Sequence, residues 1–176
     1  EGYRQITSPM QTRTFSSYVM QGDTPGKTAY ILVDAFRYEM GAALQEVING
    51  TTELYATMGT LPSFTPVGMA ALLPHAEKGF SIIVSSQGGL TPVVHDTPLT
   101  TREERITYLR EQVPGDLFAC KLSDLFPRPK KKIEDQITNN PFILITSLEI
   151  DAVGEQLEPH LARQNMDEVI RLLKRA

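Results

Sequence analysis

Short apolar runs alternate along this chain with segments whose apolar residues recur at helical spacing. Ala29–Val33 and Phe142–Thr146 are two such runs, and short runs rich in β-branched and aromatic residues are typical of buried strands. Phe36–Ile48 shows helical periodicity, and Thr100 or Thr101 is expected to cap a helix that runs to about Gln112. Because strands that alternate with helices pack in layers, the pattern predicts an α/β domain of three layers with a mostly parallel sheet.

Further elements are expected from local patterns of apolar, turn-forming and capping residues. They are a strand at Leu54–Met58, a helix starting at Thr65-Pro66, a hairpin of Phe80–Val84 with Leu90–Val94, a strand at Phe118–Leu122, a basic loop at Pro127–Lys132, and a largely helical region from about Ile150 in which Asn165 caps the last helix.

The composition limits the classes of protein to which the chain can belong. Its 176 residues, 41% hydrophobic and 22% charged, are typical of one globular domain. The net charge of −4 argues against a surface that is basic throughout. The single cysteine, Cys120, excludes an internal disulfide, and we expect it to be a small buried residue on a strand. No apolar run reaches the length of a membrane span, so we expect a cytoplasmic protein without membrane contact.

The two ends of the chain suggest how it is organised. Residues 1–28 are rich in Thr, Ser, Gln and Gly, and we expect an approach segment or linker there, followed by the domain over residues 29–176. The chain begins at Glu1 and stops at Ala176 inside an amphipathic segment. We therefore expect the domain to be truncated at its C-terminus, as a piece of a longer protein.

Asp34 directly follows the first apolar run and is the first candidate site residue. In an open α/β sheet, ligands collect outside the carboxyl ends of the strands. A carboxylate at such an end is either a ligand of a metal ion or the N-cap of the next helix. The residues alone leave both interpretations open.

Thr65 lies where the next helix begins, just before Pro66. A helix start presents backbone N–H groups and the positive end of the dipole, which favour a phosphate and a deprotonated hydroxyl. A threonine there can act as a nucleophile if a metal ion lowers its pKa. The alternative is an ordinary N-cap threonine, which is common.

Asp151 and Glu155 are four residues apart, with Gly154 between them. On a helix, both carboxylates would project from one face and repel each other unless a cation lay between them. The alternative is a solvated acidic surface that also includes Glu149 and Glu158.

The histidines and the basic run give weaker signals. His75, His95 and His160 have no ligand-like partner at motif spacing, and we expect structural or surface roles for them. We interpret Arg128–Lys132 as a solvated loop, with contact to a phosphate backbone as the alternative.

Three blocks of sequence resemble the signatures of the PglZ domain family. They are Ile31–Glu39 (Ile-Leu-Val-Asp-Ala-Phe-Arg-Tyr-Glu), Leu61–Pro74 (Leu-Pro-Ser-Phe-Thr-Pro-Val-Gly-Met-Ala-Ala-Leu-Leu-Pro) and Ser147–Glu155 (Ser-Leu-Glu-Ile-Asp-Ala-Val-Gly-Glu). The blocks occur in the family's order and together span most of the chain. PglZ domains resemble the alkaline phosphatase superfamily, so the resemblance implies the N-terminal part of an alkaline-phosphatase-like fold.

The resemblance also implies roles for individual residues. Members of the superfamily use two metal ions and a Ser or Thr nucleophile on phosphate esters. By position, Asp34 would bind one metal ion, Thr65 would be the nucleophile and a ligand, and Asp151 would be the first ligand of the other ion. Glu155 stands where related phosphodiesterases have the histidine of an Asp-x-x-Gly-His pattern. A carboxylate there suits zinc or manganese, and zinc is expected first.

One part of the superfamily's site has no counterpart in this sequence. The family completes its site with an Asp-His pair, and no Asp-His dipeptide occurs here, since His95 precedes Asp96. We therefore expect the chain to end before the strand that carries the pair. Such a chain would hold half a site, bind the catalytic metal ions weakly and turn over little or no substrate.

The resemblance implies a metal-dependent phosphoesterase, of the phosphodiesterase or phosphatase type. The setting would be phage defence of the BREX type or a response regulator that carries the same domain. The expected partners are a phosphate ester, nucleic acid included, and other phage-defence proteins. The alternative is a catalytically silent scaffold or interaction module of the same fold. A nucleotide-binding domain is disfavoured because no Gly-x-Gly-x-x-Gly or phosphate-loop pattern is present.

Overall fold

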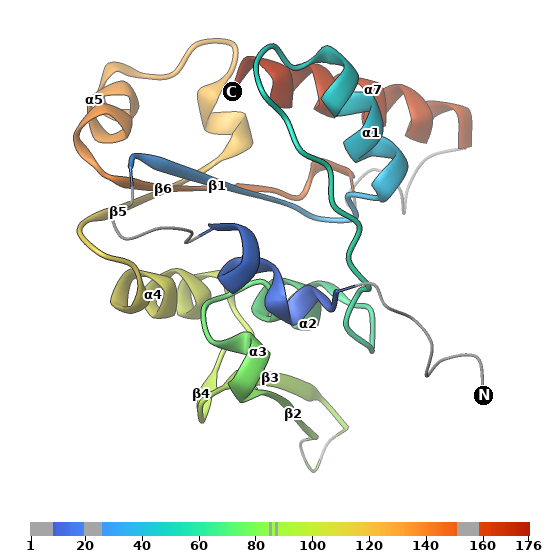
Figure 1. Cartoon of the computed structure of the whole chain (residues 1–176), viewed down its shortest axis with the longest axis vertical. Coiled ribbons are helices and arrows are strands. Elements are labelled where there is room, and N and C mark those ends of the chain that lie inside the picture. The colour runs from blue at the N-terminus through green and yellow to red at the C-terminus, as the bar shows by residue number, and fades with distance from the viewer. Residues whose placement is uncertain (1–8, 20–25, 85, 87, 151–158) are drawn as a thin grey trace. The chain divides into compact units, whose positions relative to one another are not determined.

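The computed structural model of the chain, shown in Figure 1, describes residues 9–19, 26–84, 86, 88–150 and 159–176. The chain divides into two compact units, and the chain passes back and forth between them. Unit 1 comprises Glu1–Thr28 with Ala56–Pro114, and unit 2 comprises Ala29–Tyr55 with Gly115–Ala176. Each unit is therefore built from two separate stretches of sequence.

Unit 2 contains a parallel sheet of three strands in the order β1-β6-β5. Its strands are β1 (Thr28–Val33), β5 (Leu117–Lys121) and β6 (Phe142–Ser147). β6 pairs with β5 from Leu117 opposite Phe142 to Lys121 opposite Thr146. These are the strands predicted near residues 29–33, 118–122 and 142–146, so the α/β architecture with a parallel sheet is confirmed.

Helices cover one face of this sheet (Figure 1). They are α1 (Tyr38–Val47), the 3₁₀-helix η4 (Leu122–Leu125), α5 (Lys131–Asn139) and α7 (Pro159–Arg175). α1 and α7 contact each other, and their buried residues Met40 and Val169 join Ile143 and Ile145 of β6 in one hydrophobic core. Cys120 is a buried cysteine of β5 that forms no disulfide, as predicted.

Unit 1 contains an antiparallel sheet with strand order β2-β3-β4. Its strands are β2 (Phe80–Val84), β3 (Leu90–Val94) and β4 (Thr97–Pro98). The predicted hairpin is confirmed, with Phe80 opposite Val94 and Val84 opposite Leu90. The helices of the unit are the 3₁₀-helix η2 (Gln11–Arg13), the π-helix η3 (Phe15–Val19), α2 (Thr65–Ala71), α3 (Ala76–Gly79) and α4 (Arg102–Gln112).

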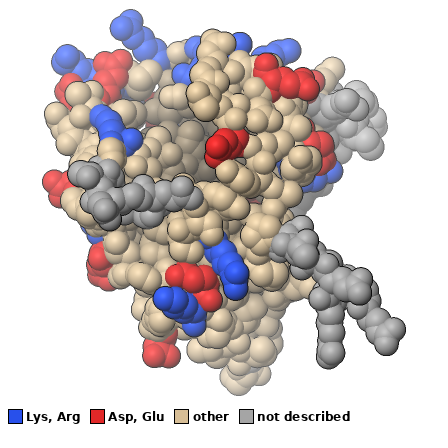
Figure 2. All heavy atoms as spheres, in the orientation of Figure 1, with Lys and Arg blue, Asp and Glu red and all other residues tan. Residues whose placement is uncertain are grey.

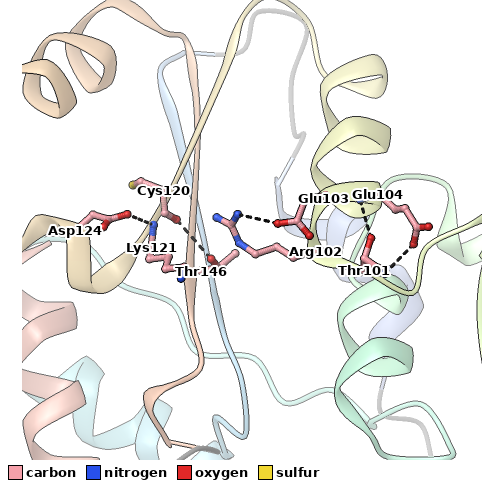
Figure 3. A network of polar contacts seen from close by, with 8 residues as sticks. All are labelled: Thr101, Arg102, Glu103, Glu104, Cys120, Lys121, Asp124 and Thr146. Atoms are coloured by element: carbon pink, nitrogen blue, oxygen red, sulfur yellow. Dashed lines mark hydrogen bonds and ion pairs between the residues drawn. The ribbon is translucent and has the colours of Figure 1, made fainter.

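α4 starts with a capping box, which Figure 3 shows in detail. Thr101 Oγ1 accepts a hydrogen bond from the Glu104 N–H (3.2 Å), and the Glu104 carboxylate accepts one from the Thr101 N–H (2.7 Å). These bonds satisfy backbone donors that a helix start leaves unpaired. The helix predicted to begin at Thr100 or Thr101 is thereby confirmed, and Leu109 on its inner face is fully buried.

Three local predictions from the sequence are wrong. Leu54–Met58 is not a strand, because its only pairing among the described residues is a single parallel bridge from Met58 to Met10. The basic run is only partly a loop, since α5 begins at Lys131. Asn165 does not cap the last helix, because α7 begins at Pro159 and continues to Arg175.

Part of the stretch expected as an approach segment is helical. Residues 10–19 belong to the stretch expected as an approach segment, and they form η2 and η3 within unit 1. Among the helices that the structure describes, none combines the length and apolar character needed to cross a membrane.

Candidate functional site

Asp34 directly follows β1 at the carboxyl edge of the parallel sheet. Its N–H donates a hydrogen bond to the carbonyl oxygen of Ser147, the last residue of β6, across 2.9 Å. The pairing of β1 with β6 thus extends one residue past the end of β1. The half-buried carboxylate of Asp34 is therefore held at the edge where parallel α/β sheets bind ligands.

The turn after Asp34 contradicts one of the two interpretations of this residue, that of a helix cap. Asp34 Oδ1 accepts a hydrogen bond from the N–H of Ala35 at 3.0 Å, and Ala35 adopts a left-handed backbone with φ of 55°. The N-cap of α1 is Arg37, three residues later. Asp34 is thus a turn residue and not a helix cap.

Other polar groups lie where β6 and β5 end. The buried hydroxyl of Ser147 donates a hydrogen bond to the carboxylate of Glu149. At the end of β5, the N–H of Lys121 donates to Asp124 Oδ2 at 2.9 Å, and Thr146 Oγ1 donates to the Cys120 carbonyl oxygen at 3.5 Å (Figure 3). The carboxylates that follow β6 and β5 are both engaged in local hydrogen bonds.

The predicted metal ligands can be followed only in part. Asp151 and Glu155 lie outside the described residues. Over the parts of the chain that the structure describes, no group of three or more His, Cys, Asp or Glu side chains is arranged to hold a metal ion. Asp34 is the one predicted carboxylate ligand whose surroundings are defined.

Thr65 is the first residue of α2, and the N-cap is Phe64. The Phe64 carbonyl oxygen accepts hydrogen bonds from the N–H groups of Val67 and Gly68, each at 3.0 Å. Pro66 has no N–H to offer. The helix start therefore presents few backbone N–H donors to an anion. Thr65 is half-buried in the first turn of α2 and does not cap the helix.

Asp34 and Thr65 belong to different units, so each is placed by the residues of its own unit. Asp34 is placed by the ends of β1 and β6, and Thr65 by the segment that leads into α2. The structure brings Asp34 together with Ser147 of the third sequence block.

Gln11 binds the backbone on both sides of Thr65, a contact that was not predicted from the sequence. Gln11 Oε1 accepts the N–H of Thr60 at 2.9 Å, and Gln11 Nε2 donates to the Gly68 carbonyl oxygen at 3.2 Å. Its partners are backbone groups 49 and 57 residues away. Because backbone groups carry no residue-specific pattern, no signal in the sequence could have identified this contact.

Two of the histidines lie side by side in unit 1. The ring centroids of His75 and His95 are 5.9 Å apart, and both residues have left-handed backbones. Both are exposed, and the side chain of His160 lies outside the described part of the structure. Nearby, burial raises the pKa of Tyr108, and the charge of Glu77 raises it further.

Charge on the face drawn in Figure 2 is mixed. Lys and Arg side chains are interspersed there with Asp and Glu side chains. The basic run contributes Lys131 and Lys132 to the exposed first turn of α5. This face agrees with the net charge of −4 and differs from a continuous basic surface.

Comparison with known proteins places the chain in a family. Residues 13–175 match the model of the BREX system PglZ alkaline phosphatase-like domain. The chain is 30% identical over 129 residues to the alkaline phosphatase-like protein PglZ of Bacillus cereus (strain H3081.97), an alignment that covers 71% of this chain and 14% of that protein. It is 31% identical over 156 residues to the alkaline phosphatase-like protein BrxZ of Escherichia coli O9:H4 (strain HS), covering 84% of this chain and 17% of that protein.

The aligned regions amount to less than a fifth of either curated relative. No solved structure matches the chain. The family model, however, covers most of the 176 residues and includes Asp34, Thr65 and the third sequence block. The chain belongs to the PglZ family of BREX-system alkaline phosphatase-like domains.

Proposed function

We propose that this chain is part of a metal-dependent hydrolase of phosphoric esters that acts in phage defence, with Thr65 as the nucleophile. The observation that carries the proposal is the match of residues 13–175 to the alkaline phosphatase-like domain of BREX systems. The proposed partners are a phosphate ester, nucleic acid included, and other phage-defence proteins. Both curated relatives are named as alkaline phosphatase-like proteins, which supports this reading.

The proposed metal ligands are Asp34, Thr65, Asp151 and Glu155. Asp34 fits the role because it lies at the carboxyl edge of the parallel sheet, where its backbone N–H donates to the Ser147 carbonyl oxygen and its carboxylate accepts the Ala35 N–H. Oxygen ligands of this kind suit divalent cations, and we propose zinc ahead of manganese. A divalent cation bound there would lower the pKa of a nearby hydroxyl and neutralise charge on phosphoryl oxygens.

The proposed reaction uses the hydroxyl of Thr65. Thr65 Oγ attacks phosphorus as its proton leaves to solvent, and the bond from phosphorus to the ester oxygen breaks. The leaving group takes up a proton and departs as an alcohol. Water then attacks the phosphothreonine, which releases phosphate or a phosphomonoester and restores the hydroxyl.

The second candidate function is a scaffold or interaction module that keeps the fold without turnover. The start of α2 favours it, because the N–H of Val67, one of the donors that a helix start can offer to a phosphate, donates to the Phe64 carbonyl oxygen instead. Turnover by the full-length protein decides between the two functions.

The test uses the full-length protein that contains this chain. Hydrolysis of bis(p-nitrophenyl) phosphate and p-nitrophenyl phosphate would be measured with zinc and with manganese. Thr65→Ala, Thr65→Ser and Asp34→Asn would be compared with Thr107→Ala and Asp135→Asn, which replace exposed residues of the same types on α4 and α5. Asp34→Asn keeps an oxygen that can accept the Ala35 N–H, so the turn is retained while the charge is lost.

The hydrolase proposal predicts metal-dependent turnover that falls about 1000-fold or more in Thr65→Ala. Thr65→Ser should retain part of the rate, and Asp34→Asn should lower both the rate and the zinc content measured by mass spectrometry. The two exposed-site variants should match the unsubstituted protein. Turnover that survives Thr65→Ala would rule out this nucleophile, and no turnover with either metal would favour the scaffold.

A further inference from the structure

The side-chain amide of Gln11 joins the two ends of the segment that contains Thr65. Gln11 Oε1 accepts the N–H of Thr60, and Gln11 Nε2 donates to the carbonyl oxygen of Gly68. Thr60 precedes Thr65 by five residues and Gly68 follows it by three. One planar group therefore fixes the backbone on both sides of the proposed nucleophile.

The two backbone groups lie in the last turn of α2 and in the segment that leads into this helix. Gly68 is four residues before Leu72, the C-cap of α2. The Leu72 N–H donates to the Met69 carbonyl oxygen at 3.4 Å. Thr60 is buried, and a buried N–H needs a hydrogen-bond partner. The Gln11 amide gives the Gly68 carbonyl oxygen a donor and the Thr60 N–H an acceptor.

The backbone around Gln11 is itself attached to the same segment. The Gln11 N–H donates to the Met58 carbonyl oxygen, and the Met58 N–H donates to the Pro9 carbonyl oxygen, both at 2.9 Å. η2, which begins at Gln11, contacts α2, and the two lie together in Figure 1. A methyl group added at Gly68 would lie 3.7 Å from Gln11 Nε2, so the amide packs directly against α2.

We propose that Gln11 is a positioning residue for Thr65: its amide fixes the path from Thr60 to Gly68 and so sets where the Thr65 hydroxyl points. This inference rests on the proposed function. α2 has seven residues, and a helix of that length is marginal without tertiary contacts. The orientation of α2 therefore depends on its tertiary contacts. A misplacement of about 1 Å in a reacting group can lower a rate about 100-fold.

Three substitutions change the amide in different ways, and one of them, Gln11→Glu, separates its acceptor from its donor. Gln11→Met keeps the length and loses both hydrogen bonds. Gln11→Glu keeps an acceptor for the Thr60 N–H but places a carboxylate oxygen against the Gly68 carbonyl oxygen. When protonated, that carboxyl group regains both a donor and an acceptor, as the amide has. Gln11→Asn keeps both groups but is one methylene shorter.

The kinetic test uses the full-length protein, with bis(p-nitrophenyl) phosphate as substrate. Gln11→Met should lower kcat about 10- to 100-fold and change KM less than about twofold, because attack and not binding is affected. For Gln11→Glu, the ratio of its kcat to that of the unsubstituted protein should rise as pH falls from 8 to 5. The same ratio for Gln11→Met should stay flat.

Two control variants distinguish positioning from a general loss of stability. Thr101→Ala removes the α4 cap in the same unit, and Gln45→Met removes another bond from a glutamine side chain to the backbone, that of Gln45 Nε2 to the Thr52 carbonyl oxygen. Both should leave kcat within about twofold of the unsubstituted value. A drop in Thr101→Ala as large as that in Gln11→Met would overturn the proposal.

Hydrogen exchange supplies a readout that does not depend on activity. In Gln11→Met, peptides covering residues 58–68 should exchange about 10-fold faster while those of α4 stay unchanged. Unchanged exchange over residues 58–68, or an unchanged kcat, contradicts the proposal. If the unsubstituted protein shows no turnover with either metal, the proposed function fails, and exchange alone then decides whether Gln11 holds this segment.

Discussion

The hydroxyl of Tyr108 donates a hydrogen bond to the backbone carbonyl oxygen of Pro74 across 3.0 Å. Tyr108 is a buried residue of α4, and Pro74 lies in the turn between α2 and α3. The bond is itself buried, so its loss leaves the Pro74 carbonyl without this partner. We expect Tyr108→Phe to lower the free energy of unfolding by about 1–2 kcal/mol.

Urea unfolding of the chain, followed by circular dichroism, measures this change. Tyr55→Phe is the matched control, because the Tyr55 hydroxyl donates to the Glu53 carboxylate in an exposed position. The control should change the free energy of unfolding by less than about 0.5 kcal/mol. Equal losses of unfolding free energy in the two variants would show that the bond to Pro74 stabilises the fold no more than the exposed bond of Tyr55.

The capping box of α4 makes a pH-dependent contribution to stability. Hydrogen bonds from the backbone at Thr101 hold the pKa of Glu104 below its usual value. A lowered pKa in the folded state gives stability that is present above the unfolded pKa, near 4.5, and that is lost as pH falls through the folded pKa. Thr101→Ala should cost about 1 kcal/mol at pH 7.

A pH series of thermal unfolding checks this expectation. The difference in melting temperature between the unsubstituted chain and Glu104→Ala, which removes the carboxylate that accepts the Thr101 N–H, should shrink as pH falls below about 4.5. A difference that stays constant from pH 7 to pH 3 would mean that the Glu104 carboxylate does not take part in the cap.

Gly79 is packed against the ring of His95. A methyl group added at Gly79 would lie 2.8 Å from three atoms of that ring, and the His95 N–H donates to the Gly79 carbonyl oxygen. We expect Gly79→Ala to cost about 1–3 kcal/mol because the ring must move. Most of that cost should disappear in the double variant Gly79→Ala/His95→Ala, as a double-mutant cycle would measure.

Gly59→Ala is the control for Gly79→Ala. A methyl group at Gly59 would meet no atom within 4 Å, and its φ is not in the left-handed region. Its effect on the unfolding midpoint should be small. Additivity of the Gly79 and His95 substitutions would show that the ring accommodates the methyl group without strain.

Ala35 adopts a left-handed backbone, with φ of 55°. A side chain in that region costs about 1 kcal/mol, whereas glycine adopts it freely. Ala35→Gly should therefore raise the free energy of unfolding by about 0.5–1 kcal/mol. Ala56→Gly, at a position without positive φ, should lower it, because glycine gives the unfolded chain more freedom. A loss of stability in both variants would contradict strain at Ala35.

The sequence predicted the elements that depend on local pattern. The strands before Asp34 and Ser147 and the helix capped by Thr101 were all found, because apolar runs and capping boxes are local signals. The strand expected at Leu54–Met58 was wrong because a strand needs a pairing partner, and among the described residues Met58 forms only an isolated bridge with Met10. The Gly-Gly turn also predicted the hairpin of β2 and β3, which forms a sheet apart from β1, β5 and β6.

The candidate site residues were named from the sequence, but the contacts that they make were not predicted. Asp34 was placed correctly at the end of a strand, but its role in the turn with Ala35 depends on backbone geometry. Gln11 gave no signal, because its partners at Thr60 and Gly68 are backbone atoms. For Thr65, the role as nucleophile rests on the family resemblance and stays a prediction.

The strand order β1-β6-β5 has a consequence for how the protein is made. β6 is the last of the three strands to leave the ribosome, yet it occupies the middle of the sheet. A nascent chain that ends before Phe142 has β1 and β5 without the strand that joins them. Residues 56–114 of unit 1 are complete by then. Unit 1 can therefore fold early during synthesis, while the sheet next to Asp34 must wait for translation to reach Ser147.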